Sequence, residues 1–164
     1  MEKQNRRAVS DGEENTMPHT YSDLTTHIVF STKDRRPWIT EGIRTELFAY
    51  LGGLVKEQKG KPIKINGVAD HVHMLVTLPA TLNVSDAMRF IKTNSSRWIN
   101  RKFGGRFAWQ KGYGVFSLSS SQVAKVATYI ANREQHHAKF NFRGEFLTML
   151  RNSRVDFDEE FLWR

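Results

Sequence analysis

The sequence predicts one α+β domain of the ferredoxin-like, or split βαβ, class. This class has an antiparallel sheet with helices on one face, and here an added C-terminal helix bears a tyrosine. Two observations predict it. The apolar patterns follow the order β-α-β-β-α-β and end in a further helix. The chain has 164 residues, of which 39% are hydrophobic and 12% aromatic, enough for a single packed core.

The first half of this order begins with a strand at residues 25–30. Its sequence, TTHIVF, is rich in β-branched and aromatic residues, and an exposed basic loop at 33–37 follows it. Residues 41–59 carry apolar side chains at helical spacing. Gly60 lies where a C-terminal glycine would end this helix.

The second half begins with two strands at 63–68 and 71–78. The short break between them at Ala69-Asp70 predicts an antiparallel hairpin. A second helix is expected over 84–102, and a strand over 115–118 completes the sheet.

Two helices complete the chain. The serines at 119–121 predict an N-terminal cap for a third helix over 121–137, and a short helix is expected near 144–151. The chain therefore divides into a flexible polar leader at 1–19, the domain at 20–155 and an acidic tail at 156–164.

The charge distribution indicates a polyanionic partner. The whole chain has a formal net charge of +8; the leader carries −1 and the tail −3, so the body carries +12. A basic body this small is typical of proteins that bind nucleic acid, although a basic soluble domain without such a partner remains an alternative. The absence of cysteine excludes disulfides and thiolate chemistry. No apolar run is long enough for a membrane span, so a cytoplasmic location is expected.

A pair of histidines opens the second strand of the hairpin, in the sequence Asp70-His71-Val72-His73. Alternate residues of a strand share a face, so both imidazoles point the same way, about 7 Å apart along the strand. They can converge on one divalent ion, and Asp70 could orient one ring. Most His-x-His pairs bind nothing, and two histidines need a further ligand from elsewhere.

The third helix carries Tyr129 beside its apolar stripe rather than in the centre of that stripe. An isolated tyrosine in this position is usually an amphipathic residue at the edge of a core. The segment from Ile130 to His137, IANREQHH, follows it, and its two histidines could be a solvated helix end.

Four blocks in this order resemble the single-tyrosine HUH transposases of bacterial and archaeal insertion sequences. The resemblance runs from about His19 to Trp163. Its four blocks are TTHIVFS at 25–31, VADHVHMLV at 68–76, WQKGYGVFSLS at 109–119 and YIANREQHH at 129–137.

The resemblance implies a specific chemistry. Tyr129 would attack a phosphate in single-stranded DNA, form a 5′-phosphotyrosine and release a 3′-hydroxyl, and a second 3′-hydroxyl would then rejoin the ends. A divalent metal, magnesium or manganese, held by His71 and His73 would polarise the phosphate. Imidazole ligands favour manganese, whereas magnesium could rely on the DNA for oxygen ligands. The resemblance also implies a homodimer with shared active sites and recognition of DNA hairpin ends.

One position departs from the family pattern. The family usually has glutamine four residues after the tyrosine as a third metal ligand, and here that residue is Arg133. Arginine cannot ligate a metal because it has no free lone pair. Arg133 could bind the scissile phosphate directly, Glu134 or Gln135 could turn inward, or the copy could be weakened or repurposed.

The helix at 84–102 and the segment after it supply candidate DNA contacts. The candidates are Lys92, Arg97 and Lys111, and the Asn94-Ser95-Ser96 group is expected as a phosphate-contacting face. Phe107 and Trp109 are expected in the core rather than as stacking platforms. Two rival functions stay open: a single-stranded nucleic-acid-binding protein of the same fold without chemistry, and a two-histidine metal hydrolase that does not need Tyr129.

Overall fold

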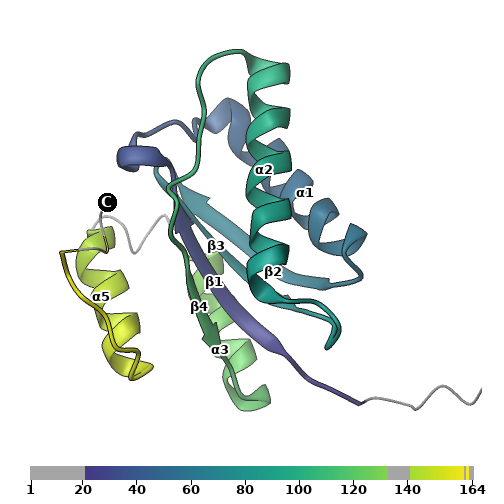
Figure 1. Cartoon of the computed structure of the whole chain (residues 1–164), viewed down its shortest axis with the longest axis vertical. Coiled ribbons are helices and arrows are strands. Elements are labelled where there is room, and N and C mark those ends of the chain that lie inside the picture. Colours follow the sequence, from purple (N-terminus) through teal and green to yellow (C-terminus); the bar gives the residue numbers. More distant parts are fainter. Residues whose placement is uncertain (1–20, 133–140, 161, 163–164) are drawn as a thin grey trace, which may run out of the picture.

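The computed structural model describes residues 21–132, 141–160 and 162, and it confirms the expected α+β fold (Figure 1). The elements are β1 (Thr25–Ser31), the 3-10 turn η1 (Lys33–Arg35), α1 (Glu41–Glu57), β2 (Lys61–Val68), β3 (His71–Thr77), α2 (Val84–Phe103), β4 (Gly114–Ser117), α3 (Ser120–Ala131) and α5 (Phe142–Asn152). In the part of the chain that the structure describes, no helix has both the length and the apolar character needed to cross a membrane.

The sheet has the strand order β2-β3-β1-β4, with every neighbouring pair antiparallel. The hairpin between β2 and β3 is therefore confirmed. The two central strands, β1 and β3, are hydrogen-bonded on both sides, and all seven residues of β1 are buried. They form the rigid middle of the domain.

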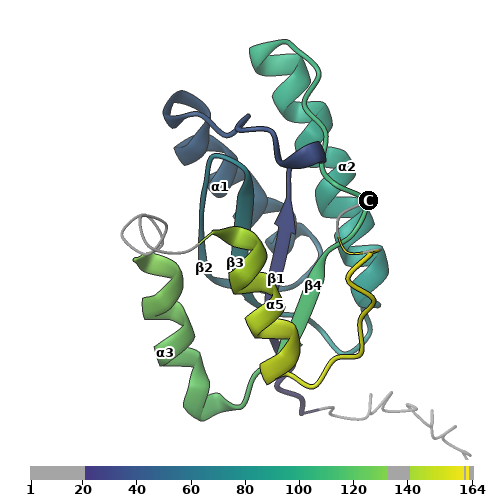
Figure 2. The same ribbon diagram turned by 90° about the vertical axis from the view of Figure 1, so that its left-hand side faces the viewer.

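Helices cover both faces of this sheet. Figures 1 and 2 show α1 and α2 on one face and α3 and α5 on the other. The main core lies under α1 and α2, because alternate residues of the central strands point there: Ile28 and Phe30 from β1, and Val72, Met74 and Val76 from β3.

The second face is held by α5. Phe142, Phe146 and Leu150, spaced four residues apart along this helix, pack on Val29 of β1 and Phe116 of β4. The strand alternation also directs the odd-numbered residues of β3 to this face. The histidine pair therefore points toward α3 and α5, away from the main core.

The helix expected over 121–137 ends earlier than predicted. It stops at Ala131, and the N–H of Asn132 bonds back to the carbonyl of Thr128 at 3.1 Å. The side-chain amide of Asn66 in β2 donates to the carbonyl oxygens of Ile130 and Ala131, at 2.9 and 3.1 Å. Tertiary bonding thus satisfies the helix end at this point, a contact that sequence spacing cannot reveal. Residues 133–137 lie outside the described residues.

Two expectations for the segment at 94–109 had different outcomes. Phe107 and Trp109 are buried as predicted. The expectation that Ser95 faces DNA phosphate is wrong, because this residue is fully buried, donates to the carbonyl of Ile91 at 2.6 Å and accepts from the Trp109 indole N–H at 2.9 Å. The side-chain groups of Asn94 and Ser96 likewise donate to carbonyls one helical turn back.

Candidate active site

The site begins with the two histidines of β3. His71 and His73 are both fully buried, with ring centroids 5.1 Å apart. They lie on one face of a central strand, as the alternate spacing predicts, while Val72 between them enters the main core. Their backbone is fixed on both sides by β1 and β2, so the rings are presented by a rigid support.

A carboxylate from a different element joins this pair. Glu145 of α5 lies beside the rings, and ligand atoms of His71, His73 and Glu145 all lie within 4.8 Å of one another. Burial raises the pKa of Glu145 to about 7. The sequence held a signal for this residue: Glu145 lies three residues after Phe142 and four before Met149, on the same side of the helix as the apolar stripe.

This donor set suits a divalent metal. Two imidazoles and one carboxylate are a recurrent combination in sites that keep coordination positions open for substrate. The carboxylate form of Glu145 would also offset the charge of an ion in a buried place. The residues present therefore fit the metal that the resemblance implies, with Glu145 as a ligand that the sequence alone did not suggest.

Asp70 and Arg35 orient the ring of His71 through hydrogen bonds on the Nδ1 side of that ring. Oδ1 of Asp70 lies 2.7 Å from Nδ1 of His71, and Oδ2 accepts from the Arg35 guanidinium at 2.7 Å. Burial alone would raise the pKa of Asp70, but hydrogen bonds from His71 and Arg35 outweigh it and hold the pKa at about 2. With the carboxylate of Asp70 on Nδ1, Nε2 is the nitrogen of this ring that would ligate a metal. The role expected for Asp70 is thus compatible with its contacts.

A third histidine, which the sequence reasoning did not select, supports the second one. Nε2 of His27 in β1 lies 2.9 Å from Nδ1 of His73, and the two rings stack with centroids 5.1 Å apart. The strand register explains the contact, because Val29 pairs with His73 and His27 lies two residues before Val29 on the same face of β1. Predicting this contact requires the pairing of β1 with β3, which the sequence pattern leaves open.

Tyr129 reaches the same place from α3. Its ring is half-buried and lies edge-on to His73 and His27, with centroid distances of 6.0 and 6.3 Å. A capping box between Ser119 and Gln122 begins the helix, and Asn66 binds its last carbonyls. Both ends are thus fixed, and the tyrosine lies beside the histidines of its own chain.

The other expected site residues lie elsewhere. Arg133 is outside the described residues. The ammonium group of Lys92 donates to the backbone carbonyls of residues 110–112, and burial lowers its pKa to about 8. Arg97 is exposed on α2, which covers the opposite face of the sheet from the histidines, and Lys111 is exposed in the segment before β4. The structure therefore brings the histidines together with Tyr129, but not with Lys92, Arg97 or Lys111.

The sequence is similar to those of known transposases. A sequence model of the family described as "Transposase IS200 like" matches residues 20–133. The transposases for insertion sequence element IS200 of Salmonella typhimurium and Salmonella typhi are each 29% identical over 145 residues, covering 84% of this chain and 92% of the relative.

Two solved structures share the fold. One, described as a transposase from Deinococcus radiodurans R1, has a TM-score of 0.58 at 21% identity and covers 71% of this chain and 95% of its own. The other, a REP-associated tyrosine transposase bound to a REP hairpin, has a TM-score of 0.55 at 15% identity, covering 74% of this chain and 73% of its own. Since the family model spans well over half of the sequence, the chain belongs to the IS200-like transposase family.

Proposed function

We propose that this transposase cuts and rejoins single-stranded DNA, with Tyr129 as the nucleophile and a divalent ion held by His71, His73 and Glu145. The observation that carries the proposal is the position of the Tyr129 ring, whose centroid lies 6.0 Å from that of His73, one of the three candidate ligands. A nucleophile and a cation site must face one phosphate for this reaction, and these residues come from three separate elements.

In the first step, the phenolic oxygen of Tyr129 forms a bond to phosphorus while the bond to the 3′ oxygen breaks. The phenol loses its proton, the 3′ oxygen gains one, and the strand remains attached through a 5′-phosphotyrosine. A bound divalent ion would supply charge neutralisation on the phosphate oxygens. Because the phosphodiester energy is kept in the tyrosine link, a second 3′-hydroxyl can attack it and join the ends without ATP.

Residues around the reacting groups have supporting roles. Asp70 and Arg35 hold His71, and His27 holds His73, so each ring keeps a fixed direction. Asn66 holds the end of the helix that carries Tyr129. Arg133, four residues after the tyrosine, remains proposed as a contact to the scissile phosphate.

The nucleic-acid partner follows from charge and family. We infer that the body, with its net charge of +12, binds single-stranded DNA including hairpin ends, with Arg97 and Lys111 as exposed candidate contacts. The REP-associated relative was solved with a hairpin. Lys92 is a weaker candidate, because its ammonium already binds three backbone carbonyls.

The test is covalent capture. End-labelled single strands covering both flanks of the gene are incubated with the protein and Mn²⁺, and adducts are separated under denaturing conditions. We expect an adduct that Tyr129→Phe abolishes and that the control Tyr50→Phe preserves, since Tyr50 stacks on Trp98, which belongs to α2 on the opposite side of the sheet. Binding without any adduct would instead support a nucleic-acid-binding protein of this fold.

A further inference from the structure

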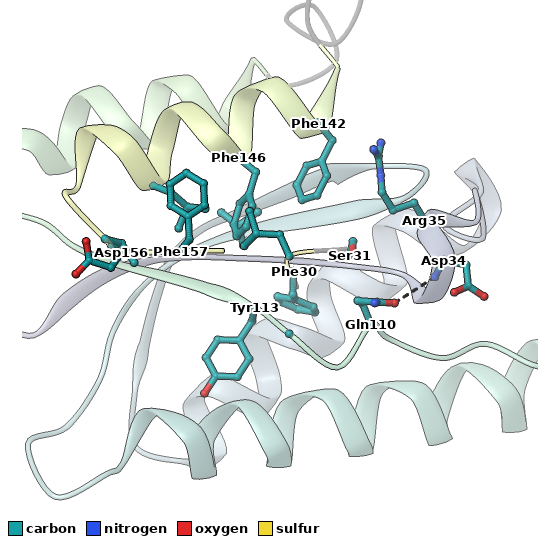
Figure 3. Close-up of a pocket in the computed structure, with 15 residues that line it drawn as sticks. Phe30, Ser31, Asp34, Arg35, Gln110, Tyr113, Phe142, Phe146, Asp156 and Phe157 are labelled. Atoms are coloured by element: carbon teal, nitrogen blue, oxygen red, sulfur yellow. Dashed lines mark hydrogen bonds between the residues drawn. The ribbon is translucent and has the colours of Figure 1, made fainter. Parts of the chain in front are cut away.

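A cavity of about 520 Å³ lies next to the histidine site, between α5, β1 and the segment that leads into β4. Figure 3 shows Phe142 and Phe146 reaching into it from α5 and Tyr113 on the opposite side. Its volume falls within the usual range of small-ligand sites, roughly 300–1,000 Å³. Its walls are mostly apolar and include five aromatic side chains, which favours a flat, unsaturated ring as the occupant: Phe30, Tyr113, Phe142, Phe146 and Phe157.

The cavity and the proposed metal site share a wall. The ring of Phe142 lines the cavity and lies 4.2 Å, centroid to centroid, from the ring of His71. Arg35 also lines it, with its guanidinium carbon 4.9 Å from the centre of the Phe142 ring and its Nη2 bonded to Asp70. A DNA strand held by one phosphate at the histidines would therefore bring an adjacent nucleotide close to this cavity.

The charges around the cavity select which part of a nucleotide can enter. The carboxylates of Asp34 and Asp156 both line it and would repel a phosphate, while the charge of Arg35 is already paired with Asp70. An uncharged base meets no such repulsion. Gln110 lies at the same end as Asp34, and its Oε1 accepts the Asp34 N–H at 3.2 Å (Figure 3). A side-chain amide can both donate to and accept from the edge of a base.

The wall opposite α5 is fixed without any ligand. The ammonium group of Lys92 on α2 donates hydrogen bonds to the carbonyls of residues 110–112, and the N–H of Gln110 bonds to the carbonyl of Ser31 at 2.9 Å. Thr32 and Trp109 form a backbone bridge next to it. The half-buried Lys92 thus fixes the 110–112 segment that forms this wall. A wall that is fixed before a ligand binds lowers the entropy cost of binding.

We propose that this cavity binds the base of one unpaired nucleotide adjacent to the phosphate that is cut. The inference rests on the proposed function, because that function places DNA at the histidines. The base would stack among Phe142, Phe146 and Tyr113, and Gln110 would read its edge. The cavity would then contribute to the choice of cleavage position, while the metal site and Tyr129 perform the reaction.

A plug in the cavity tests the proposal. Gly112 lines the cavity, and a Cβ atom added there would meet nothing within 4 Å, so Gly112→Leu fills space without a backbone clash. Gly53 is equally open but lies on α1 under the opposite face, which makes Gly53→Leu a matched control. In a Tyr129→Phe background, Gly112→Leu should weaken binding of a random-sequence single-stranded 30-mer pool about tenfold, the loss typical of one stacked base. Gly53→Leu should leave binding unchanged, and both should bind Mn²⁺ normally.

Photochemical cross-linking locates the base directly. The same pool with one 5-iododeoxyuridine per strand is irradiated with the Tyr129→Phe protein, and the modified peptides are mapped by mass spectrometry. We expect cross-links at Tyr113 or Phe146. Cross-links confined to other segments, or unchanged binding by Gly112→Leu, would overturn the proposal. Covalent capture at Tyr129 in the unmodified protein is scored separately, so loss of the adduct with cavity cross-links retained counts against the reaction and not against the cavity.

Discussion

The carboxyl group of Glu145 should make metal binding at the proposed site depend on pH. Its neighbours are two buried imidazoles, and burial raises its pKa to about 7. Only the deprotonated form can ligate a metal, so an ion and a proton compete for this group. The consequences can be measured at this one residue.

Replacing Glu145 should impair metal binding directly. We expect Glu145→Gln to lower Mn²⁺ affinity at least about tenfold, because an amide lacks the negative charge that the ion needs. Isothermal titration at pH 8 measures the change. Glu57→Gln on α1, an exposed residue at the far side of the sheet, is the control and should bind Mn²⁺ normally. Equal affinities for wild type and Glu145→Gln would exclude this ligand.

Arg133 gives a complementary prediction. From the sequence alone, Arg133→Gln would be expected to raise metal affinity by restoring the family ligand. If Glu145 already fills that role, Arg133→Gln leaves the wild-type affinity unchanged but recovers part of the loss in the Glu145→Gln background. A large gain in the wild-type background, with no effect of Glu145→Gln, would place the third ligand on the segment after Tyr129.

The pKa of Glu145 also predicts how stability depends on pH in metal-free buffer. Its value in the folded protein, about 7, exceeds the ordinary 4.5, so the folded state holds the proton more tightly than the unfolded state does. Its contribution is therefore complete below pH 4.5 and is lost as the pH rises through 7. In urea unfolding with EDTA, the unfolding free energy of wild type should fall relative to that of Glu145→Gln as the pH rises over this interval. A wild-type free energy that rises relative to that of the variant would contradict the assignment.

At the scale of elements, α3 carries Tyr129, the proposed nucleophile, and is attached to an edge strand of the sheet. Asn66 of β2 is the contact that binds the last carbonyls of the helix, and its Oδ1 also accepts the N–H of Gly67. Tyr129 lies two residues before Ala131, so a contact that fixes the end of the helix also restricts the position of the tyrosine.

Removing this attachment should affect the reaction more than the metal site. Asn66→Ala is expected to lower the unfolding free energy by about 1–2 kcal/mol, the usual result of losing such hydrogen bonds. It should also slow adduct formation, while Mn²⁺ affinity stays unchanged because the ligands lie on β3 and α5. The control Lys64→Ala removes an exposed side chain from the same strand. If Asn66→Ala reacts at the wild-type rate, the attachment does not position Tyr129.

At the scale of the whole molecule, the described chain brings its own tyrosine to its own histidines. The family resemblance implies dimers in which the tyrosine helix of one subunit completes the site of the other. The two arrangements differ in a mixing experiment. His73→Ala and Tyr129→Phe proteins, combined and co-refolded, should form no adduct if each site is built within one chain. Recovery of activity would show that sites are shared between subunits.

The sequence predicted the architecture well because the fold depends on local patterns. Helical and alternating periodicities placed nearly every element, and the His-x-His spacing on one strand placed both imidazoles on one face. The sequence pattern could not predict the roles of Glu145 and His27, because each depends on contacts between distant segments. Glu145 reaches the histidines through the packing of α5, and His27 through the register between β1 and β3. The role of Lys92 was also inaccessible, since a lysine on a helix is usually solvated, and only packing shows that it holds the 110–112 segment.

The measurement that tests the central claim most directly is the identity of the DNA-linked residue. Adducts formed in Mn²⁺ with single strands from the flanks of the gene are digested with nuclease and protease, and the remaining phosphonucleotide is located by tandem mass spectrometry. The account predicts one modified residue, Tyr129, carrying a 5′-linked nucleotide. A nucleotide on any other residue, or strand cleavage with no protein-linked nucleotide, would contradict it.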